Sequence, residues 1–452
     1  MASPSSKFKF KDIIFKDVKG KTQEFPAILG FTYEEDIFSP FIYGSLIVND
    51  SKTNIIGTLP IQGGESLTLK IEGPDDSETY EFEFIIYAIK NRTALDRTQT
   101  YEVKLISPPA MKNESSRPCG TYSGKQSRIV SRMLRDSLEV DMSRVYIETS
   151  KYETKFQADG SSNTFKLINK LSLQAVSEDF VPKKNSKSTS GEIKPLEGTA
   201  GFLFYENRVG FHFRSVDSLC DSEKQKPVKK FEYAPSNVDY QETNNNRIYE
   251  YSFDSEVNLI ENLRKGSYSS VLGFYDQSTG KYEEYQYSME NTFSSMKKLG
   301  SQTKLGETQS KYSENPTRFM AVITDHETWW DGEGPGSHEP EDGGSGENTF
   351  SDYSKQFVAQ SLGRIGILGT QKLRIAVTGS PAIMVGDTVE VYLPNVVPTD
   401  ERKSNVWDDE HSGVYLVSHI INKYDNGSAS MTTQLSLIRD SSGRVDRSSN
   451  VK

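Results

Sequence analysis

The chain has 452 residues, of which 35% are hydrophobic and 11% aromatic, and a formal net charge of −10 at pH 7. The hydrophobic content excludes wholesale disorder, and the length predicts several domains. The acidic balance argues against a protein that holds nucleic acid by general electrostatic attraction. Met1–Lys11 shows no secretion signal and no later stretch has the apolar length of a membrane span, so we expect no stable membrane insertion.

The first segment predicts antiparallel β-structure. Apolar side chains recur at every second position in Leu67–Ile71, Tyr80–Ile86 and Tyr101–Leu105. This period places one row of side chains on a core and the other toward solvent or a partner. Pro108–Pro109 ends the segment, because proline cannot donate a hydrogen bond to a strand ladder.

The middle of the chain predicts a mixed region. Apolar residues fall on one helical face in Gln126–Leu138, and a second helix is expected from Asn163, which is a suitable cap. Pro182–Pro195 is rich in Lys, Ser and Gly and indicates an exposed loop. Phe202–Phe213 predicts a hairpin whose polar turn is Glu206-Asn207-Arg208.

A second strand-rich region begins at Ile248. It continues with a short helix over Val257–Leu263 and two strands, Leu272–Tyr275 and Tyr282–Tyr287. Asp331–Asn348 is rich in Gly, Pro and acidic residues, which is typical of a surface loop.

The last region predicts a helix followed by four strands. The helix is expected near Tyr353–Leu362, and Asn426-Gly427 favours a hairpin turn because both residues tolerate a positive φ. The four strands are Leu373–Val377, Val389–Leu393, Val414–Ile421 and Met431–Ile438.

Two short segments resemble each other. Gly64–Leu69 and Gly386–Val391 each have a glycine, an acid and then alternating apolar residues, and each precedes a long hairpin. One such match arises either by chance or by duplication. With duplication, one chain carries two related barrels, and three copies present six of them to a six-fold ring.

The order of these features resembles the central baseplate hub protein of T-even-type contractile phages. The C-terminal strands are also similar to tail hub proteins and to type VI secretion spikes. The segments that carry the resemblance are Ala27–Leu29, Phe41–Asp50, Gly201–Glu206, Gly210–Arg214, Val385–Val389, Ser412–Val417 and Leu435–Asp440.

The resemblance implies a β-rich α+β fold with two tube-protein-like antiparallel β-barrels and an inserted α+β region. We expect a first barrel, a helix and hairpin insertion, the first part of a second barrel, a polar and acidic loop region, the rest of the second barrel and a flexible tail. Their expected ranges are 1–110, 111–240, 241–290, 291–350, 351–440 and 441–452.

The implied function is structural, without enzymatic activity. The chain is expected to form a homotrimer in the virion baseplate, assembled in the host cytoplasm, that joins the six-fold tail tube to the three-fold spike. The implied partners are the tail spike protein, tail tube or tube-initiator proteins, and neighbouring baseplate proteins. DNA is expected to pass through the channel without specific binding during genome ejection. The alternative from another class is a virion-associated cell-wall hydrolase on a β-rich scaffold.

No motif specifies catalysis or a cofactor. The chain has no Walker-type phosphate loop, HExxH, paired Cys-x-x-Cys or GxSxG. Asp325–Asp331, with Glu333, His338 and Glu339, is either a set of cation ligands or a solvated acidic loop. Because it lacks regular ligand spacing, we predict no catalytic, cofactor or metal residues.

The remaining candidates also favour structural roles. His212 and His419 lie in predicted strands, where packing or hydrogen bonding is expected. Cys119 and Cys220 are expected to be free thiols. The lysines of Lys224–Lys230 form a basic patch that suggests either phosphate binding or a solvated loop, and the second interpretation is favoured.

Overall fold

The computed structural model is dominated by β-strands, and most of them belong to one sheet of 13 strands. The strand-rich α+β fold expected from the sequence is therefore confirmed. The structure describes residues 8–51, 55–58, 61–73, 78–95, 98–179, 200–233, 246–255, 258–276, 280, 282–290, 296–300, 311–324, 350–395 and 407–441.

The N-terminal strands form a sheet in the order β3-β4-β7-β6-β5-β1-β2, with all neighbours antiparallel. Their alternate apolar residues are buried in a shared core, as the predicted period requires. We call this unit the first sheet. Its strands are β1 (Lys9–Lys16), β2 (Thr22–Gln23), β3 (Ala27–Asp36), β4 (Tyr43–Asp50), β5 (Ser66–Glu72), β6 (Thr79–Leu95) and β7 (Thr98–Ile106), with the short helix α1 (Ile55–Thr58) between β4 and β5.

The C-terminal strands close into a six-stranded barrel in the order β19-β13-β14-β18-β21-β20, since β20 pairs back to β19. One strand departs from the expected antiparallel pattern, because β13 runs parallel to both of its neighbours. We call this unit the barrel. Its strands are β13 (Lys229–Tyr233), β14 (Arg247–Ser255), β18 (Gln371–Thr378), β19 (Thr388–Tyr392), β20 (Gly413–Asp425) and β21 (Ser430–Arg439).

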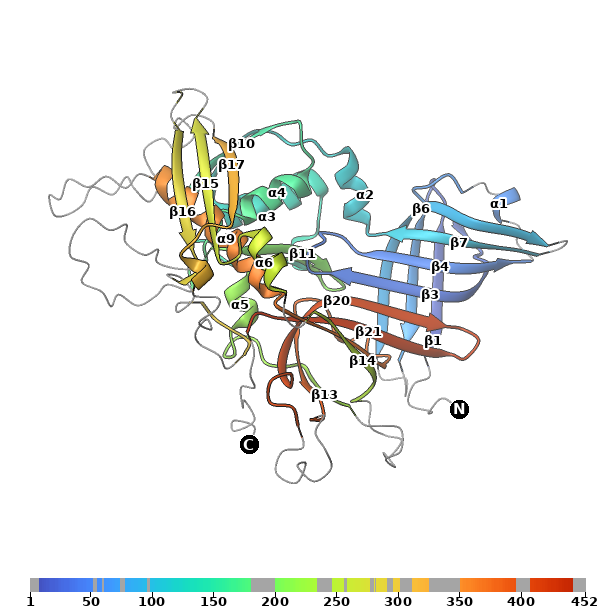
Figure 1. Cartoon of the computed structure of the whole chain (residues 1–452). Coiled ribbons are helices and arrows are strands. Elements are labelled where there is room, and N and C mark those ends of the chain that lie inside the picture. The colour runs from blue at the N-terminus through green and yellow to red at the C-terminus, as the bar shows by residue number, and fades with distance from the viewer. Residues whose placement is uncertain are drawn as a thin grey trace.

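The two units are joined edge to edge. Residues 30–36 of β3 pair with residues 419–425 of β20, and Figure 1 shows these two strands side by side. The Phe8 backbone N–H, just before β1, also donates to the Ala429 carbonyl in the β20–β21 turn at 3.0 Å. Tyr424 of β20 packs in the core of the first sheet. The contact is therefore both a hydrogen-bonded ladder and a shared hydrophobic core.

The β20–β21 turn forms where Asn-Gly predicts it, but by another geometry. Asp425 pairs with Ser430, and the residue with positive φ is Ala429 rather than Asn426 or Gly427. The Asp425 carboxylate accepts hydrogen bonds from the backbone N–H groups of Gly427 and Ser428, both at 3.2 Å. A four-residue loop held by this aspartate replaces the tight two-residue turn.

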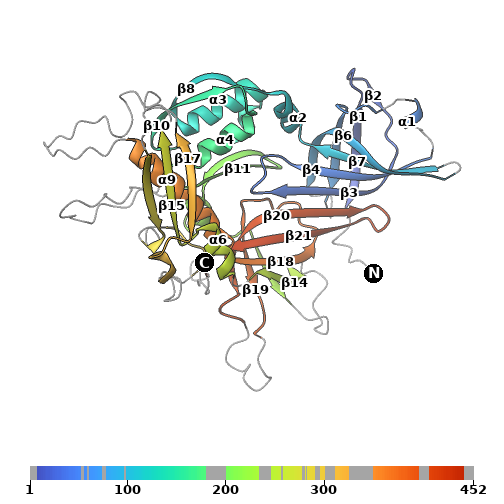
Figure 2. The same ribbon diagram turned by 45° about the horizontal axis from the view of Figure 1, so that its top comes forward.

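The inserted region packs two helices against a small sheet, as Figure 2 shows. Helix α3 spans the predicted residues, and the Asn163 side chain accepts from the Lys166 N–H to cap α4. The predicted hairpin is β11–β12. The elements are α2 (Pro108–Ser115), β8 (Cys119–Lys125), α3 (Gln126–Leu138), β9 (Val145–Ile147), β10 (Glu153–Asp159), α4 (Thr164–Ser172), β11 (Phe202–Asn207), β12 (Gly210–Ser215) and α5 (Val216–Cys220).

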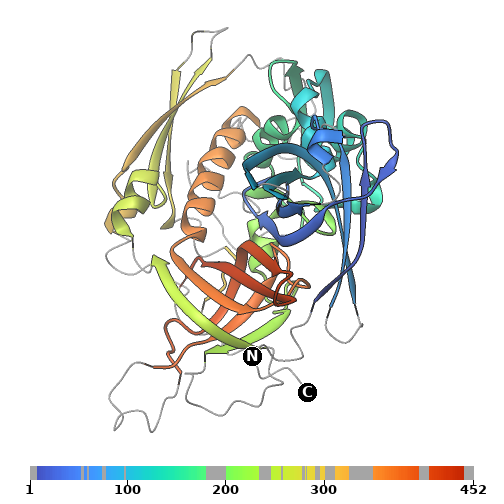
Figure 3. The same ribbon diagram turned by 90° about the vertical axis from the view of Figure 1, so that its right-hand side faces the viewer.

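A separate small sheet has the order β16-β15-β17. Strand β15 (Ser269–Asp276) pairs with β16 (Tyr282–Ser288) and β17 (Arg318–Thr324). Figure 3 shows α9 (Phe350–Leu368) between this sheet and the inserted region. The short helix α6 (Leu259–Lys265) packs Leu259 and Leu263 against the hydrophobic core that lies between this small sheet and α9.

Strand pairing differs from the expected segment boundaries in two places. Within 241–290 only β14 enters the barrel, whereas β15 and β16 pair with β17 from the segment 291–350, which was expected to be loop. Strand β13 joins the barrel from within 111–240. Local periodicity identifies strands but does not specify their long-range partners. The loop predictions for 182–195 and 331–348 lie outside the described residues.

The two similar segments adopt the same backbone geometry. In Gly64-Glu65 the glycine N–H donates to the Ile86 carbonyl at 2.8 Å, and the Ile86 N–H donates back to the Glu65 carbonyl at 2.9 Å. In Gly386-Asp387 the same exchange occurs with Val417, at 3.0 and 2.9 Å. Both glycines have positive φ, +99° and +87°. This shared strand-entry motif supports the duplication, since it recurs in the first sheet and in the barrel.

Candidate functional site

The first sheet, the inserted region and the barrel meet around a buried carboxyl group, that of Glu35 on β3. One oxygen accepts the Arg208 backbone N–H at 2.7 Å and also the Tyr33 hydroxyl. The other oxygen accepts the Val385 N–H at 2.9 Å, from the loop between β18 and β19. One side chain therefore joins all three units.

Glu35 lies on the core-facing side of β3, in phase with Phe31 and Tyr33. Burial raises the pKa of the Glu35 carboxyl to about 7, because removal of water disfavours the charged form, while the hydrogen bonds act in the opposite direction. An acid in this position is tolerated because each oxygen has a donor.

A second buried carboxyl group, Glu206, lies at the end of β11. The Ser107 hydroxyl, just before α2, donates to it at 2.5 Å. The Ser107 backbone N–H in turn donates to the Ile42 carbonyl, which ties this contact to the first sheet. Burial raises the pKa of the Glu206 carboxyl to about 8. We call Glu35 and Glu206 the junction carboxylates.

The β11–β12 turn is held tightly between the units. The Asn207 amide donates to the Val385 carbonyl at 3.3 Å, and its oxygen accepts the Gly210 N–H at 3.3 Å. Gly210 has φ +150°, and a Cβ there would lie 1.9 Å from the Arg144 carbonyl oxygen. Glycine is therefore required at this position, since any side chain would push the turn out of the junction.

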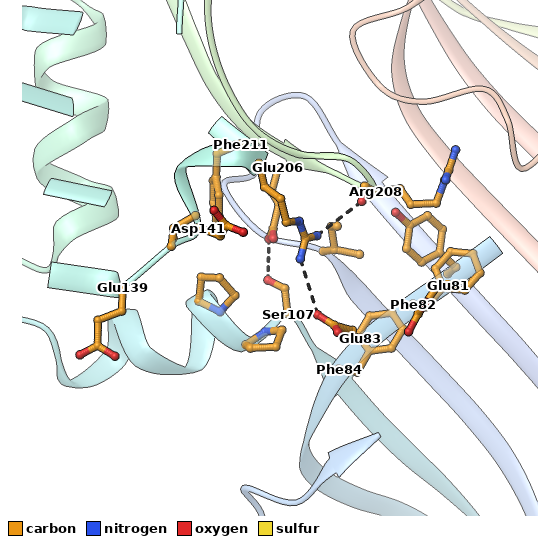
Figure 4. A pocket seen from close by; sticks show the side chains of 17 residues that line it. Glu81, Phe82, Glu83, Phe84, Ser107, Glu139, Asp141, Glu206, Arg208 and Phe211 are labelled. Carbon is orange, nitrogen blue, oxygen red and sulfur yellow. Dashed lines mark hydrogen bonds and ion pairs between the residues drawn. The ribbon is translucent and has the colours of Figure 1, made fainter. Parts of the chain in front are cut away.

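A pocket of about 390 Å³ opens beside the junction, between the first sheet, α2 and the β11–β12 turn. Figure 4 shows Glu81 and Glu83 on one side, Glu139 and Asp141 on the other, and Glu206 between them. We call it the junction pocket. It is lined by Tyr33, Ile42, Glu81, Phe82, Glu83, Phe84, Ser107, Pro108, Pro109, Glu139, Val140, Asp141, Arg144, Glu206, Arg208, Gly210 and Phe211.

The histidines expected to be packed or hydrogen-bonded are so placed. The His212 ring stacks on the rings of Tyr146 and Tyr205, and its Nε2 lies 2.9 Å from the Asn207 oxygen. Burial lowers the pKa of His212 to about 4, so the ring stays neutral at pH 7. His419 Nε2 lies 2.8 Å from a carboxylate oxygen of Glu34.

The cysteines are free as expected, and the lysines of the basic patch have acidic neighbours. Cys119 and Cys220 are free thiols. In the basic patch, Lys224 pairs with Asp179 at 2.6 Å, and Lys230 lies 3.7 Å from Glu390. These acidic neighbours argue against a phosphate site, but the loop interpretation is wrong for Lys229 and Lys230, which lie in strand β13, where the Lys229 ammonium donates to the Ser380 hydroxyl at 3.1 Å.

The acidic segment proposed as a cation ligand set, 325–339, lies outside the described residues. Within the described ranges, no group of three or more His, Cys, Asp or Glu residues is placed to hold a metal ion. Helices of the described part that are long and apolar enough to span a membrane are also absent.

Sequence analysis missed the junction carboxylates, although a signal for one of them exists. Glu35 occupies a core-facing position of a strand that is otherwise apolar on that side, and such an acid needs buried donors. The donors come from residues 173 and 350 positions away in the chain. The carboxyl group is visible in the sequence as an irregularity, but its partners are not.

Comparison with known proteins identifies the fold. No protein-family model matches the chain, and no curated protein matches it by sequence. A tail protein from Neisseria meningitidis MC58 matches with a TM-score of 0.50 and 11% identity, over 95% of this chain and 96% of that one.

A second solved structure agrees. The 43 kDa tail protein of prophage MuSo2 from Shewanella oneidensis matches with a TM-score of 0.50 and 10% identity, over 95% of this chain and 98% of that one. Both matches extend over almost the whole of each protein, so the similarity concerns the arrangement of all the units. The resemblance drawn from the sequence is confirmed as a resemblance of fold: this chain has the fold of phage tail proteins.

Proposed function

We propose that the chain is the trimeric central hub of a contractile tail baseplate, joining the six-fold tail tube to the three-fold spike. The observation that carries this proposal is the edge-to-edge pairing of two β-units that share one strand-entry motif. Three such chains present six related units, which matches a six-fold partner on one side and a three-fold partner on the other.

The junction carboxylates give this role a mechanical basis. A symmetry adaptor needs its two β-units at a constant angle, because six units must close a ring. The β3–β20 ladder sets the contact, and Glu35 adds bonds to the inserted region and to the barrel. A hub of this kind would transmit contraction as a rigid body.

In this function the chain lies in the virion baseplate, after assembly in the host cytoplasm. Its partners are the tail spike protein, tail tube or tube-initiator proteins, and neighbouring baseplate proteins. DNA passes through the central channel during genome ejection without specific binding, and the net charge of −10 favours passage by repelling phosphates. The role needs no catalysis and no cofactor.

The hub proposal is tested first by the solution mass. Light scattering over a range of concentrations should give a mass near three times the 50.8 kDa of one chain. Negative-stain images of the same sample should show a ring with six lobes. A mass that remains that of one chain, both alone and with the spike protein, would contradict the proposal.

A cell-wall hydrolase remains the alternative, and one observation favours testing it. Glu206 is a carboxyl group with a raised pKa beside a pocket, which is a feature of general acids. A turbidity assay on bacterial cell walls distinguishes the two functions. The hub predicts no clearing, whereas a hydrolase predicts clearing that E206Q abolishes.

A further inference from the structure

The first sheet and the barrel arrange their strands in the same order. Leaving the two-residue β2 aside, the neighbours are β3-β4-β7-β6-β5-β1 in the first sheet and β14-β18-β21-β20-β19-β13 in the barrel. When the strands of each unit are numbered along the chain, both orders read 2-3-6-5-4-1. Only one pair differs in direction, because β1 is antiparallel to β5 whereas β13 is parallel to β19. The two units therefore match strand by strand, beyond the strand-entry motif that they share.

The irregularities of the two units also coincide. The β3–β4 ladder shifts register within 28–30, and the β14–β18 ladder shifts within 248–250. The β6–β7 ladder shifts within 86–88 and the β20–β21 ladder within 417–419, in each case directly after the residue bonded by the strand-entry motif. A bulge has a defined place in a strand, so these four positions set a residue-by-residue correspondence. By this correspondence β14 matches β3, and β6 matches β20.

The contact that joins the two units inside the chain has an unused counterpart. Inside the chain, β3 pairs with the second half of β20. The matching strands are β14 and the second half of β6. Strand β6 pairs with β5 only through 79–85, and none of the described strands pairs with 88–95 on that side. Strand β14 meets β13 only through 247–248, which leaves the same side of 250–255 without a described partner strand.

Both of these strand edges are exposed. Figure 1 shows the β6–β7 hairpin reaching past the other strands of the first sheet, and residues 90–95 of β6 are all exposed. Leu95 of β6 is 70% exposed and Tyr249 of β14 is 57% exposed, and on β14 Glu250 and Ser252 are exposed as well. An exposed edge with unpaired backbone groups is a template for another strand. The two edges are therefore surfaces to which a strand can be added.

We propose that β14 of one chain adds as an antiparallel strand to the second half of β6 of a second copy, just as β3 adds to β20 within one chain. A second copy is the occupant because each chain carries both edges of this contact, in the geometry that already joins its own two units. The inference rests on the proposed hub and specifies its subunit contact. Three contacts within chains and three between chains then alternate around a closed ring.

The correspondence also gives the register between the two copies. Strand β6 has a second shift between Lys90 and Thr93, after which Thr93 pairs with β7 as Lys423 pairs with β21. Within the chain, Thr32 of β3 faces Lys423 of β20. Because Ser252 of β14 matches Thr32, Ser252 of one copy should face Thr93 of the next.

This pair of positions suits a disulfide. The Ile37 N–H donates to the Ser418 carbonyl at 2.8 Å, and bonded pairs alternate along an antiparallel ladder, so Thr32 and Lys423 exchange no backbone bonds. The Cα atoms of such a pair lie about 4.5 Å apart. Disulfides span Cα distances of about 4.4–6.8 Å. Cysteines at the matching positions, 252 and 93, should therefore link two copies.

The test is oxidation of the double variant T93C/S252C, followed by gel electrophoresis without reductant. The full chain carries C119S as well, because Cys119 is an exposed thiol whereas Cys220 is buried. We expect bands at two and three times the 50.8 kDa of one chain. The control T79C/S252C uses an exposed position of β6 on the half that β5 already covers. It should give about tenfold less product, because a disulfide does not form between Cα atoms more than about 7 Å apart.

Single variants test whether the contact joins two different edges. T93C and S252C, each expressed alone, should give no linked product, whereas their co-expression should give linked pairs of chains and nothing larger. Linkage in T93C alone would mean that two β6 edges pair with each other, and that result would overturn the proposal. So would equal linkage in the T79C/S252C control.

The mass from light scattering separates this contact from the hub proposal. A trimer without the cross-link overturns the β14–β6 contact and leaves the hub proposal standing. Linked bands that continue past three chains support the contact in an open filament and contradict the hub alone. A chain that stays single and forms no link overturns both.

Discussion

Two buried polar clusters hold this molecule together, and they solve the problem of buried charge in different ways. The junction carboxylates, Glu35 and Glu206, are bonded by neutral donors, and their pKa values are raised to about 7 and about 8. The second cluster pairs the α9 residue Arg364 with Asp440 at 2.8 Å and places its Nε 3.7 Å from Asp217. We call it the arginine cluster.

The difference between the junction carboxylates and the arginine cluster indicates which buried contacts respond to pH. An acid bonded to neutral donors binds a proton more tightly in the folded state, so it links stability to pH. A buried guanidinium favours the ionised form of an acid beside it, so burial raises the pKa of Asp217 only to about 6, below the values of the junction carboxylates. The first cluster is therefore the pH-sensitive joint, and the second is a charge-compensated anchor for α9.

The largest expected effect comes from removal of the buried cation. R364M leaves Asp217 and Asp440 buried without their guanidinium and also loses the bond to the Lys297 carbonyl. We expect a loss of about 3–5 kcal/mol in the free energy of unfolding. Urea unfolding followed by tryptophan fluorescence measures it.

The control for that variant is R374M, which breaks an exposed pair with Asp254 that also measures 2.8 Å. An equal loss of stability in the two variants would show that burial does not distinguish the arginine cluster from a surface pair.

The next largest effect is a change in how the free energy of unfolding depends on pH. The folded pKa of Glu206 is raised to about 8, from an ordinary value of 4.5, so its contribution is complete below pH 4.5 and is lost as the pH rises through 8. E206Q cannot ionise, while its amide oxygen still accepts from Ser107. At pH 9 we expect the free energy of unfolding of E206Q to exceed that of the parent protein by about 2–4 kcal/mol. Its free energy of unfolding should also depend less steeply on pH.

Urea midpoints at pH 5, 7 and 9 measure this slope, and E250Q should keep the parent slope. Parallel curves for E206Q and the parent protein would mean that Glu206 does not titrate in this range, and the contrast between the clusters would then fail.

A smaller effect is expected inside the arginine cluster. Burial raises the pKa of Asp217 to about 6, against the opposing effect of Arg364. D217N keeps an oxygen for the Lys297 N–H, which donates at 3.1 Å. We expect a change within about 1 kcal/mol at pH 7, because Asp440 still pairs with the guanidinium. A loss as large as that of R364M would show that both acids are needed.

The smallest effect is expected at the surface. E34Q removes the exposed carboxylate that lies 2.8 Å from His419. Since exposed pairs contribute about 0–1 kcal/mol, the unfolding midpoint should shift little, and less still in high salt. A shift larger than that of D217N would reverse the order predicted from burial.

Local patterns predicted most elements correctly. Gln126–Leu138 forms α3 with its apolar face buried, and Asn163 caps α4. The strand Leu67–Ile71 is fully buried on alternate positions. These features depend on side-chain period and capping chemistry, which act within a few residues of the chain.

These local patterns did not predict which distant strands pair with one another. Lys229–Tyr233 enters the barrel as a parallel strand between β14 and β19, and Arg318–Thr324 pairs with β15. Parallel partners are joined by long connections, so neither turn residues nor loop length indicates the register. The candidate site shares this limit, because the donors to Glu35 come from two distant segments.

The sequence by itself determined the strand-rich character, the helices of the inserted region, the hairpins and the repeated glycine–acid motif, because each is set by neighbouring residues. Only the tertiary structure decided that β3 and β20 pair, that three units meet at Glu35, and that acids gather around one pocket. These features depend on which distant backbone groups and side chains share the same buried space. Glu35 connects the three units because the fold buries its carboxyl group beside donors from distant parts of the chain.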